Sequence, residues 1–160
     1  MSVPVNNQDQ IYQIFPVGYI RRALMEVFIE ILPPFRSALK LLDGFSHAQV
    51  FWWFSKFDDT ESRTTTQFED FPFDAPCLGV FACRSPKRPN PIGLTTVRIL
   101  AIDYPKGLVK IPKFDAFENT PIVDLKGYLP SCDRVKDVKV PAWASHWPEW
   151  MSEDGLDLEN

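Results

Sequence analysis

The chain has 160 residues, of which 45% are hydrophobic, and it carries 17 lysines and arginines against 21 aspartates and glutamates, for a formal net charge of -4. This length suits one domain whose core is large enough to fold without disulfides or metal. The negative charge excludes a strong non-specific attraction to phosphate backbones, so an anionic partner must be held by local groups.

Strands dominate the predicted secondary structure. The 15 prolines break long helices, because each removes a backbone donor and disfavours helix in the residue before it. Segments rich in β-branched and aromatic residues, bounded by Pro, Gly or Asp, predict strands. In chain order they are 11–20, 24–32, 48–57, 77–84, 92–103 and 107–117. This pattern predicts a mainly β fold, a compact six- to seven-stranded β-barrel with one or two short helices.

The two short helices are predicted in different parts of the chain. PPFRSALKLLDGF begins with prolines and stops at Asp-Gly, so one or two turns can link two strands there. Near the end, Trp143, Trp147 and Trp150 recur at four- and three-residue steps, which favours an aromatic face that packs in the core or in a dimer. Pro148 keeps that helix short or broken.

The remaining segments complete a one-domain organisation. Residues 58–76 combine a polar cluster with prolines and predict a long loop. We expect a single domain over 1–160, with a core at about 11–140 and a solvated acidic tail at 151–160.

The cysteines and the N-terminus bear on the compartment. Three cysteines without a CxxC pair leave an odd thiol, which favours a reducing environment. The N-terminus lacks the apolar core of a signal peptide, and no apolar run approaches the ~18 residues that a membrane helix requires. We therefore expect a cytoplasmic chain without a membrane segment. With two histidines and no metal-ligand spacing, no metal site is predicted.

The segment GVFACRSPKRPNPIG, residues 79–93, is the most unusual in the chain. Its prolines exclude helix, so Arg84 and Arg88 sit on a stiff support. A guanidinium held in this way can bind a carboxylate or phosphate through two hydrogen bonds. The alternative is that the arginines pair with acidic side chains and the prolines only turn the chain.

This segment resembles the signature GVFATRSPxRPNPIG of the TsaA-like family, the tRNA threonylcarbamoyladenosine methyltransferases. LLDGFSHAQVFWWF (41–54) resembles LxGLExFSHxxVLxxFH of that family, and FDAFENTPIVDLKGYLP (114–130) resembles LDLxDGTPVxDIKPYxP. IFPVGYIR is similar to the first strand of the family. The blocks agree in order and spacing and cover most of residues 12–135.

The resemblance implies a β-barrel that binds S-adenosylmethionine, commonly as a homodimer, and methylates an exocyclic nitrogen of threonylcarbamoyl-adenosine in tRNA. It implies cofactor contacts in three places. Arg84 falls on the arginine of the signature, with Arg88 as a further cation, and Leu94 follows the glycine of the signature. The other matched positions are Ser55, Lys56, Ala116, Phe117, Glu118 and Asn119.

Methyl transfer to nitrogen also needs a proton acceptor. Asp124 and Tyr128 lie on one face of an extended chain and are the candidates, although Asp124 and Lys126 could instead form a structural pair. Phe54 and Phe81 are candidates for aromatic walls of the cofactor site.

Several departures from the family pattern keep other functions open. The loop after the first strand lacks the basic insertion of longer members, Cys83 replaces Thr, Gly127 replaces Pro, and Asn119 replaces Gly at a turn where Asn tolerates left-handed backbone. The acidic balance is unusual for a tRNA-binding enzyme. A methyltransferase acting on a small metabolite, or a non-catalytic module that binds S-adenosylmethionine, are the alternatives.

Overall fold

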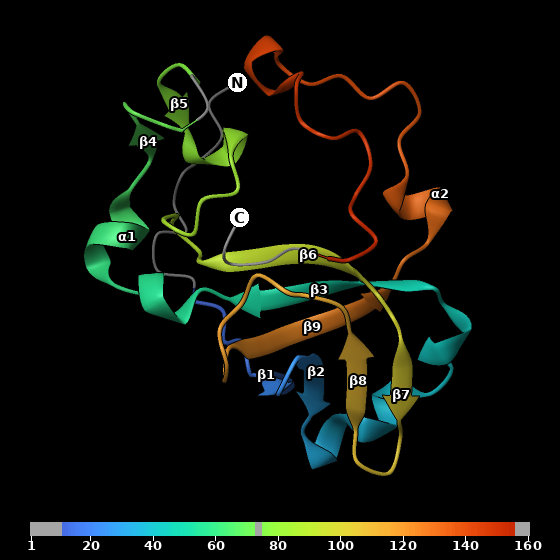
Figure 1. Cartoon of the computed structure of the whole chain (residues 1–160). Coiled ribbons are helices and arrows are strands. Elements are labelled where there is room, and N and C mark those ends of the chain that lie inside the picture. The colour runs from blue at the N-terminus through green and yellow to red at the C-terminus, as the bar shows by residue number, and fades with distance from the viewer. Residues whose placement is uncertain (1–10, 73–74, 156–160) are drawn as a thin grey trace, which may run out of the picture.

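The computed structural model describes residues 11–72 and 75–155 (Figure 1). Within them seven strands form one antiparallel sheet in the spatial order β6-β3-β9-β1-β2-β8-β7. The strands are β1 (Gly18–Ala23), β2 (Glu26–Ile31), β3 (His47–Trp53), β6 (Ile92–Arg98), β7 (Ala101–Asp103), β8 (Leu108–Ile111) and β9 (Pro121–Gly127). A two-stranded ribbon of β4 (Gln67–Phe68) and β5 (Leu78–Gly79) lies apart from this sheet.

The two edge strands of the sheet follow each other in the chain. Only residues 99 and 100 separate β6 from β7, and the chain bends there, so that the sheet curls round towards its own edge (Figure 1). At this bend the backbone N–H of Leu100 donates to Lys110 and that of Ile99 donates to Ser46. The predicted mainly β fold with six to seven strands is therefore confirmed.

The strands bury alternate side chains, as the period of two in their sequences requires. In β3, Ala48, Val50 and Trp52 are buried between half-buried neighbours. The core is formed by the inward side chains of the strands together with Phe114, which is fully buried. The indole of Trp52 lies 5.6 Å from the Phe114 ring, between ring centroids, so aromatic packing closes this end of the core.

Helices are short, as the prolines require. The helix predicted after the second strand is found as two 3-10 turns, η1 (Pro33–Leu39) and η2 (Leu42–Gly44). The C-terminal tryptophans contribute only η5 (Ala142–Ala144), where the rings of Trp143 and Trp147 meet edge to face. The other short elements are η3 (Ser55–Phe57), α1 (Thr60–Thr64), η4 (Val80–Ala82) and α2 (Pro130–Asp133).

Several predicted boundaries differ from the structure. Residues 11–17 precede β1 and form no strand, and the predicted strand at 77–84 is mostly loop around η4. The loop predicted at 58–76 contains α1 and β4, and β9 was absent from the predicted strands. In the acidic tail, the backbone of Lys113 donates to Asp154 at 3.2 Å, while 156–160 lie outside the described residues.

In the part of the chain that the structure describes, no helix has the length and apolar character needed to cross a membrane.

Candidate functional site

A cavity of about 480 Å³ lies where three segments that are distant in sequence meet. These are the end of β3 with η3, the loop that carries Arg84, and residues 115–120 before β9. The lining is rich in aromatic side chains and also contains charges of both signs. It consists of Trp52, Trp53, Phe54, Ser55, Lys56, Phe57, Arg84, Pro86, Asp115, Phe117, Glu118, Asn119 and Thr120. Such a mixture of apolar walls with a few polar groups is typical of small-molecule sites.

The cavity brings together six of the residues expected to contact a cofactor: Ser55, Lys56, Arg84, Phe117, Glu118 and Asn119. Three others do not line it. Leu94 offers its carbonyl to the guanidinium of Arg84 at 3.2 Å, Ala116 is fully buried, and Arg88 is directed to backbone carbonyls. Of the two candidate aromatic walls, Phe54 lines the cavity, whereas Phe81 lies outside the lining and is 89% exposed.

Residues 114–117 alternate between core and cavity, and residues 118–120 all line the cavity. Phe114 and Ala116 point into the core, so Asp115 and Phe117 face the cavity. The segment then turns at Asn119, whose φ of 65° is left-handed, in agreement with the expectation that asparagine tolerates this turn. The bends at 115–116 and the turn at 118–119 therefore place these side chains on the cavity, outside any strand.

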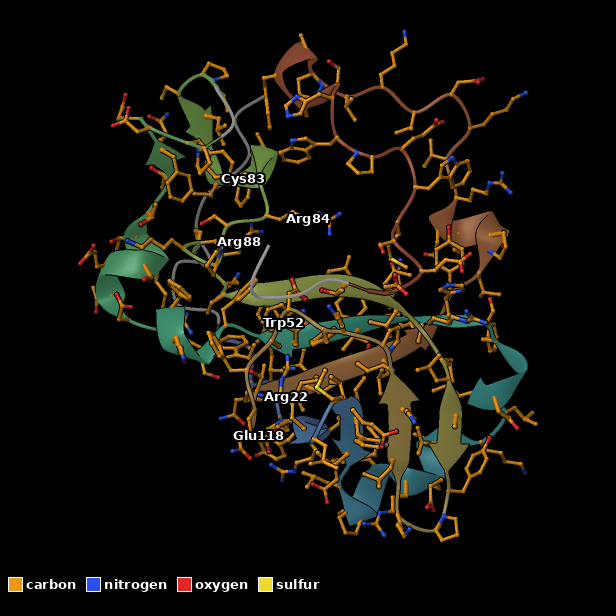
Figure 2. The ribbon with its side chains drawn as sticks, in the orientation of Figure 1. Arg22, Trp52, Cys83, Arg84, Arg88 and Glu118 are labelled. Atoms are coloured by element: carbon orange, nitrogen blue, oxygen red, sulfur yellow. The ribbon has the colours of Figure 1, made fainter. Side chains whose placement is uncertain are left out.

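Arg22 of β1 holds this segment in place through hydrogen bonds to its backbone. Its guanidinium donates to the carbonyl oxygens of Phe114 and Ala116 at 2.6 and 2.8 Å. Its backbone N–H donates to Oε2 of Glu118 at 2.6 Å. In Figure 2, Arg22 and Glu118 lie on one side of Trp52, and Arg84 and Arg88 lie on the other. Charge-assisted hydrogen bonds to backbone carbonyls fix the path of 114–118.

Arg88 holds the shape of the loop that presents Arg84. Its guanidinium donates to the carbonyl oxygens of Ser85 and Cys83, both at 2.7 Å, and to that of Val80 at 3.3 Å. The carbonyls of Cys83 and Ser85 lie outside any helix, and this arginine gives them hydrogen-bond donors. A contact between Arg88 and a cofactor stays a prediction.

A chain of hydrogen bonds runs from the core into the cavity. The indole Nε1 of Trp52 donates to Oγ1 of Thr95 at 3.1 Å, and this hydroxyl donates to Oδ1 of Asp115 at 3.3 Å. Gly93 makes room for the indole, because a Cβ at that position would lie 2.7 Å from Nε1 of Trp52. Gly93, the last residue of the signature segment, therefore allows the Trp52 indole to pack against β6 next to the cavity.

Charge in the cavity is unevenly distributed. Burial raises the pKa of the Asp115 carboxyl above its ordinary value, although hydrogen bonds from its own backbone and from Thr95 act in the opposite direction. Nζ of Lys56 lies 3.3 Å from the centroid of the Phe117 ring, a cation–π contact. Lys56 and Arg84 place positive charge on the same cavity.

Sequence reasoning missed Asp115. Its only signal in the sequence is a single carboxylate between Phe114 and Ala116, a position whose side chain points away from the core when its two neighbours are buried. Among the described residues, no group of three or more potential metal ligands is found.

The two candidate proton acceptors lie outside the cavity lining. Oδ2 of Asp124 forms an ion pair with Nζ of Lys126 at 2.6 Å, and both side chains are about half exposed. The ring of Tyr128 contacts the ring of His47, with centroids 6.5 Å apart. Their catalytic roles stay predictions.

The relatives of similar sequence among known proteins include the following three. A probable S-adenosyl-L-methionine-binding protein of Archaeoglobus fulgidus is 38% identical over 114 residues, which are 71% of this chain and 29% of that protein. One from Pyrococcus horikoshii is 39% identical over 116 residues, 72% of this chain and 81% of the relative. The tRNA (adenine(37)-N6)-methyltransferase of Escherichia coli is 31% identical over 145 residues, 79% and 58% of the two chains.

The fold has solved counterparts. A crystal structure of TrmO from Pseudomonas aeruginosa superimposes with a TM-score of 0.62 and 28% identity, covering 81% of this chain and 62% of that one. This chain therefore spans less than two thirds of several of the proteins it matches. The model of the tRNA-methyltransferase O N-terminal domain matches residues 16–134, a range that contains the whole sheet and every residue of the cavity lining. The chain belongs to the family of tRNA-methyltransferase O N-terminal domains.

Proposed function

We propose that the chain is an S-adenosylmethionine-dependent methyltransferase that acts on tRNA. More narrowly, we propose that it methylates the exocyclic nitrogen of threonylcarbamoyl-adenosine beside the anticodon. The observation that carries the proposal is the cavity in which Arg84, Lys56 and the segment 115–120 meet. Relatives named as S-adenosyl-L-methionine-binding proteins and a tRNA (adenine(37)-N6)-methyltransferase support the cofactor and the substrate class.

The residues of the cavity fit S-adenosylmethionine. Aromatic side chains such as Trp53 and Phe54 can contact the adenine and the apolar carbons, and Lys56 or Arg84 can pair with the amino-acid carboxylate. Asp115 and Glu118 supply negative charge for the cationic parts of the cofactor. A volume of about 480 Å³ is within the range of ligand sites.

The contribution of the protein to the reaction would be chiefly positioning. When bound, S-adenosylmethionine supplies a methyl group, whose departure leaves a neutral thioether. Arg22 and Arg88 hold the two cavity walls through backbone carbonyls, so the ligand meets a site that needs little rearrangement. Holding two reactants in line can supply much of the rate enhancement of a transfer reaction.

The acceptor nitrogen must release a proton. We propose Asp124 and Tyr128 as the acceptors of this proton. This role requires a substrate that extends from the cavity to the end of β9. A homodimer with the cofactor near the subunit interface, and a cytoplasmic location, belong to the same proposal. The three free cysteines agree with a reducing compartment.

One observation favours a second candidate function. The net charge of -4 is unfavourable for binding a polyanion, so the same cavity could serve methyl transfer to a small metabolite. A non-catalytic module that only binds the cofactor uses the same cavity as well, and two measurements separate these cases.

The first measurement is calorimetric titration of the protein with S-adenosylmethionine. We expect binding, and we expect Arg84→Ala to weaken it by roughly tenfold because one charge-assisted contact is lost. Arg98→Ala, at the far end of β6, is the matched control and should bind as the wild type does. Absence of binding by the wild-type protein would contradict every form of the proposal.

The second measurement uses a labelled methyl donor with total tRNA from cells that lack this protein. Label in the nucleoside next to the anticodon is the expected result. Label in a small-molecule extract but not in tRNA would favour the metabolite, and binding without transfer to either pool would favour the non-catalytic module. Gel filtration with light scattering tests the homodimer.

A further inference from the structure

The carboxylate of Asp115 is the feature of the cavity that the proposed function does not yet use. It is half-buried, and burial raises its pKa. Among the described residues, no lysine or arginine forms an ion pair with it, and the hydroxyl of Thr95 is its only side-chain partner. A carboxylate withdrawn from water without a cation is costly for a fold. Because this one faces a ligand cavity, the missing cation is expected to come with the ligand.

S-adenosylmethionine carries two cations of different character. Its ammonium group is strongly hydrated and needs several hydrogen-bond acceptors, so it suits the polar mouth of a site. Its sulfonium is a diffuse cation without N–H or O–H donors, and it suits a site made of aromatic rings and a carboxylate. Asp115 lines the cavity together with Trp52 and Phe54, whose rings pack against each other, and Thr95 links the Asp115 carboxylate to the Trp52 indole.

The carboxylate is also held in place from behind. Trp52 donates to Thr95, and Thr95 donates to Oδ1 of Asp115. Both donors stand on paired strands, β3 and β6, which makes the support rigid. A fixed charge needs no rearrangement when a cation approaches, which is the condition for strong electrostatic recognition.

We propose that Asp115 recognises the sulfonium charge of the methyl donor and thereby distinguishes the cationic donor from its neutral demethylated product. This inference rests on the proposed function, because it assumes that S-adenosylmethionine occupies the cavity. Its consequence is selective release. Once the methyl group has left, the thioether gives Asp115 no charge to pair with, so the product is bound less tightly than the donor.

The experiment compares Asp115→Asn with the wild-type protein by calorimetric titration with three ligands. S-adenosylmethionine is cationic at sulfur, S-adenosylhomocysteine is neutral there, and sinefungin carries an amine in place of the sulfonium. We expect the variant to bind the two cationic ligands roughly tenfold more weakly, as expected for loss of one partly screened charge pair. Its affinity for S-adenosylhomocysteine should stay within about twofold of the wild type.

Two further variants make the result specific. Thr95→Val removes the hydroxyl that orients the carboxylate, so it should cause a smaller loss that again affects only the cationic ligands. Asp103→Asn makes the same carboxyl-to-amide change in β7, outside the cavity lining, and should alter none of the affinities. Circular dichroism and thermal melting verify that each variant is folded.

Equal weakening of all three ligands by Asp115→Asn would overturn the inference, since it would place Asp115 against the ammonium or in a structural role. Unchanged binding of S-adenosylmethionine would overturn it as well. Failure of the wild-type protein to bind any of the three ligands would instead contradict the proposed function, and the inference would fall with it.

Discussion

At the scale of the residue, Gly93 is a packing requirement of the signature segment. A Cβ at this position would meet the indole of Trp52, with Nε1 at 2.7 Å, and both residues lie on paired strands that cannot easily separate. We expect Gly93→Ala to lower the free energy of unfolding by about 1 to 3 kcal/mol, as overpacking of a core does.

Urea unfolding measures this change, and Gly44→Ala is the matched control, because no atom lies within 4 Å of a Cβ built at that position. If both variants lose the same stability, crowding against Trp52 is not the reason for the glycine.

Asp115 predicts a second effect, on the pH dependence of stability. Its pKa in the folded protein is raised above the ordinary value of 3.8, which it has in the unfolded chain. At any pH between the unfolded-state pKa and the folded-state pKa, the folded protein therefore binds more protons than the unfolded chain. The stability contribution of this group therefore falls as pH rises through that window and stays low above it. Asp115→Asn lacks this component, and its stability relative to the wild type should increase over the same window.

Thermal melting of both proteins at steps of about one pH unit from pH 3 to pH 8 measures how the difference in their stability changes with pH. If Asp115→Asn is less stable than the wild type by the same amount at every pH, the Asp115 side chain stabilises the fold and the predicted cost of its buried charge is absent.

At the scale of the element, the segment 114–118 depends on Arg22 more than on its neighbour Arg21. Arg22 donates to two backbone carbonyls of the segment, whereas Arg21 contacts only side chains, those of Glu30, Glu118 and Asn119. Arg22→Met keeps the apolar stem but leaves these carbonyls without their donor, and we expect a loss of about 2 to 3 kcal/mol. Arg21→Met should cost less than about 1 kcal/mol, as surface ion pairs do.

Hydrogen exchange of residues 114–120 tests the same comparison locally. Faster exchange in Arg22→Met than in Arg21→Met is expected, because the hydrogen bonds of Arg22 hold this segment. Equal exchange in the two variants would mean that Phe114 and the turn at Asn119 suffice to hold the segment.

The elements also show what a sequence can predict. Strands with alternating burial, such as β2 and β3, follow from local pattern, whereas the left-handed turn at Asn119 was expected because asparagine stands where the resembling family has glycine. The segment 77–84 has the composition of a strand, yet most of it forms no ladder and Phe81 stays exposed. Pairing partners, not composition, decide that outcome.

The candidate site divides in the same way. Ser55, Lys56 and Arg84 could be identified because contiguous motifs carry them. The link from Trp52 through Thr95 to Asp115 joins three distant segments, which only the register of β3 with β6 and the path of 114–120 bring together. A sequence read one segment at a time does not contain that information.

At the scale of the whole molecule, the barrel and the C-terminal segment are expected to be separable. The family match ends at residue 134, and residues 134–142 are exposed throughout. The contacts of this segment with the barrel include the hydrogen bond between Lys113 and Asp154 at 3.2 Å. A protein shortened to residues 1–140 should therefore keep the sheet and the cavity.

We expect that shortened protein to melt within about 3 °C of the full chain, which corresponds to roughly 1 kcal/mol for a domain of this size, and to bind S-adenosylmethionine within about twofold. A second protein ending at residue 152 removes the contact of Asp154 with Lys113, keeps the tryptophans, and so separates the two effects. If the 1–140 protein fails to fold while the 1–152 protein does, the segment around η5, including Trp143 and buried Ala144, belongs to the folding unit. The domain would then extend beyond the region shared with the family.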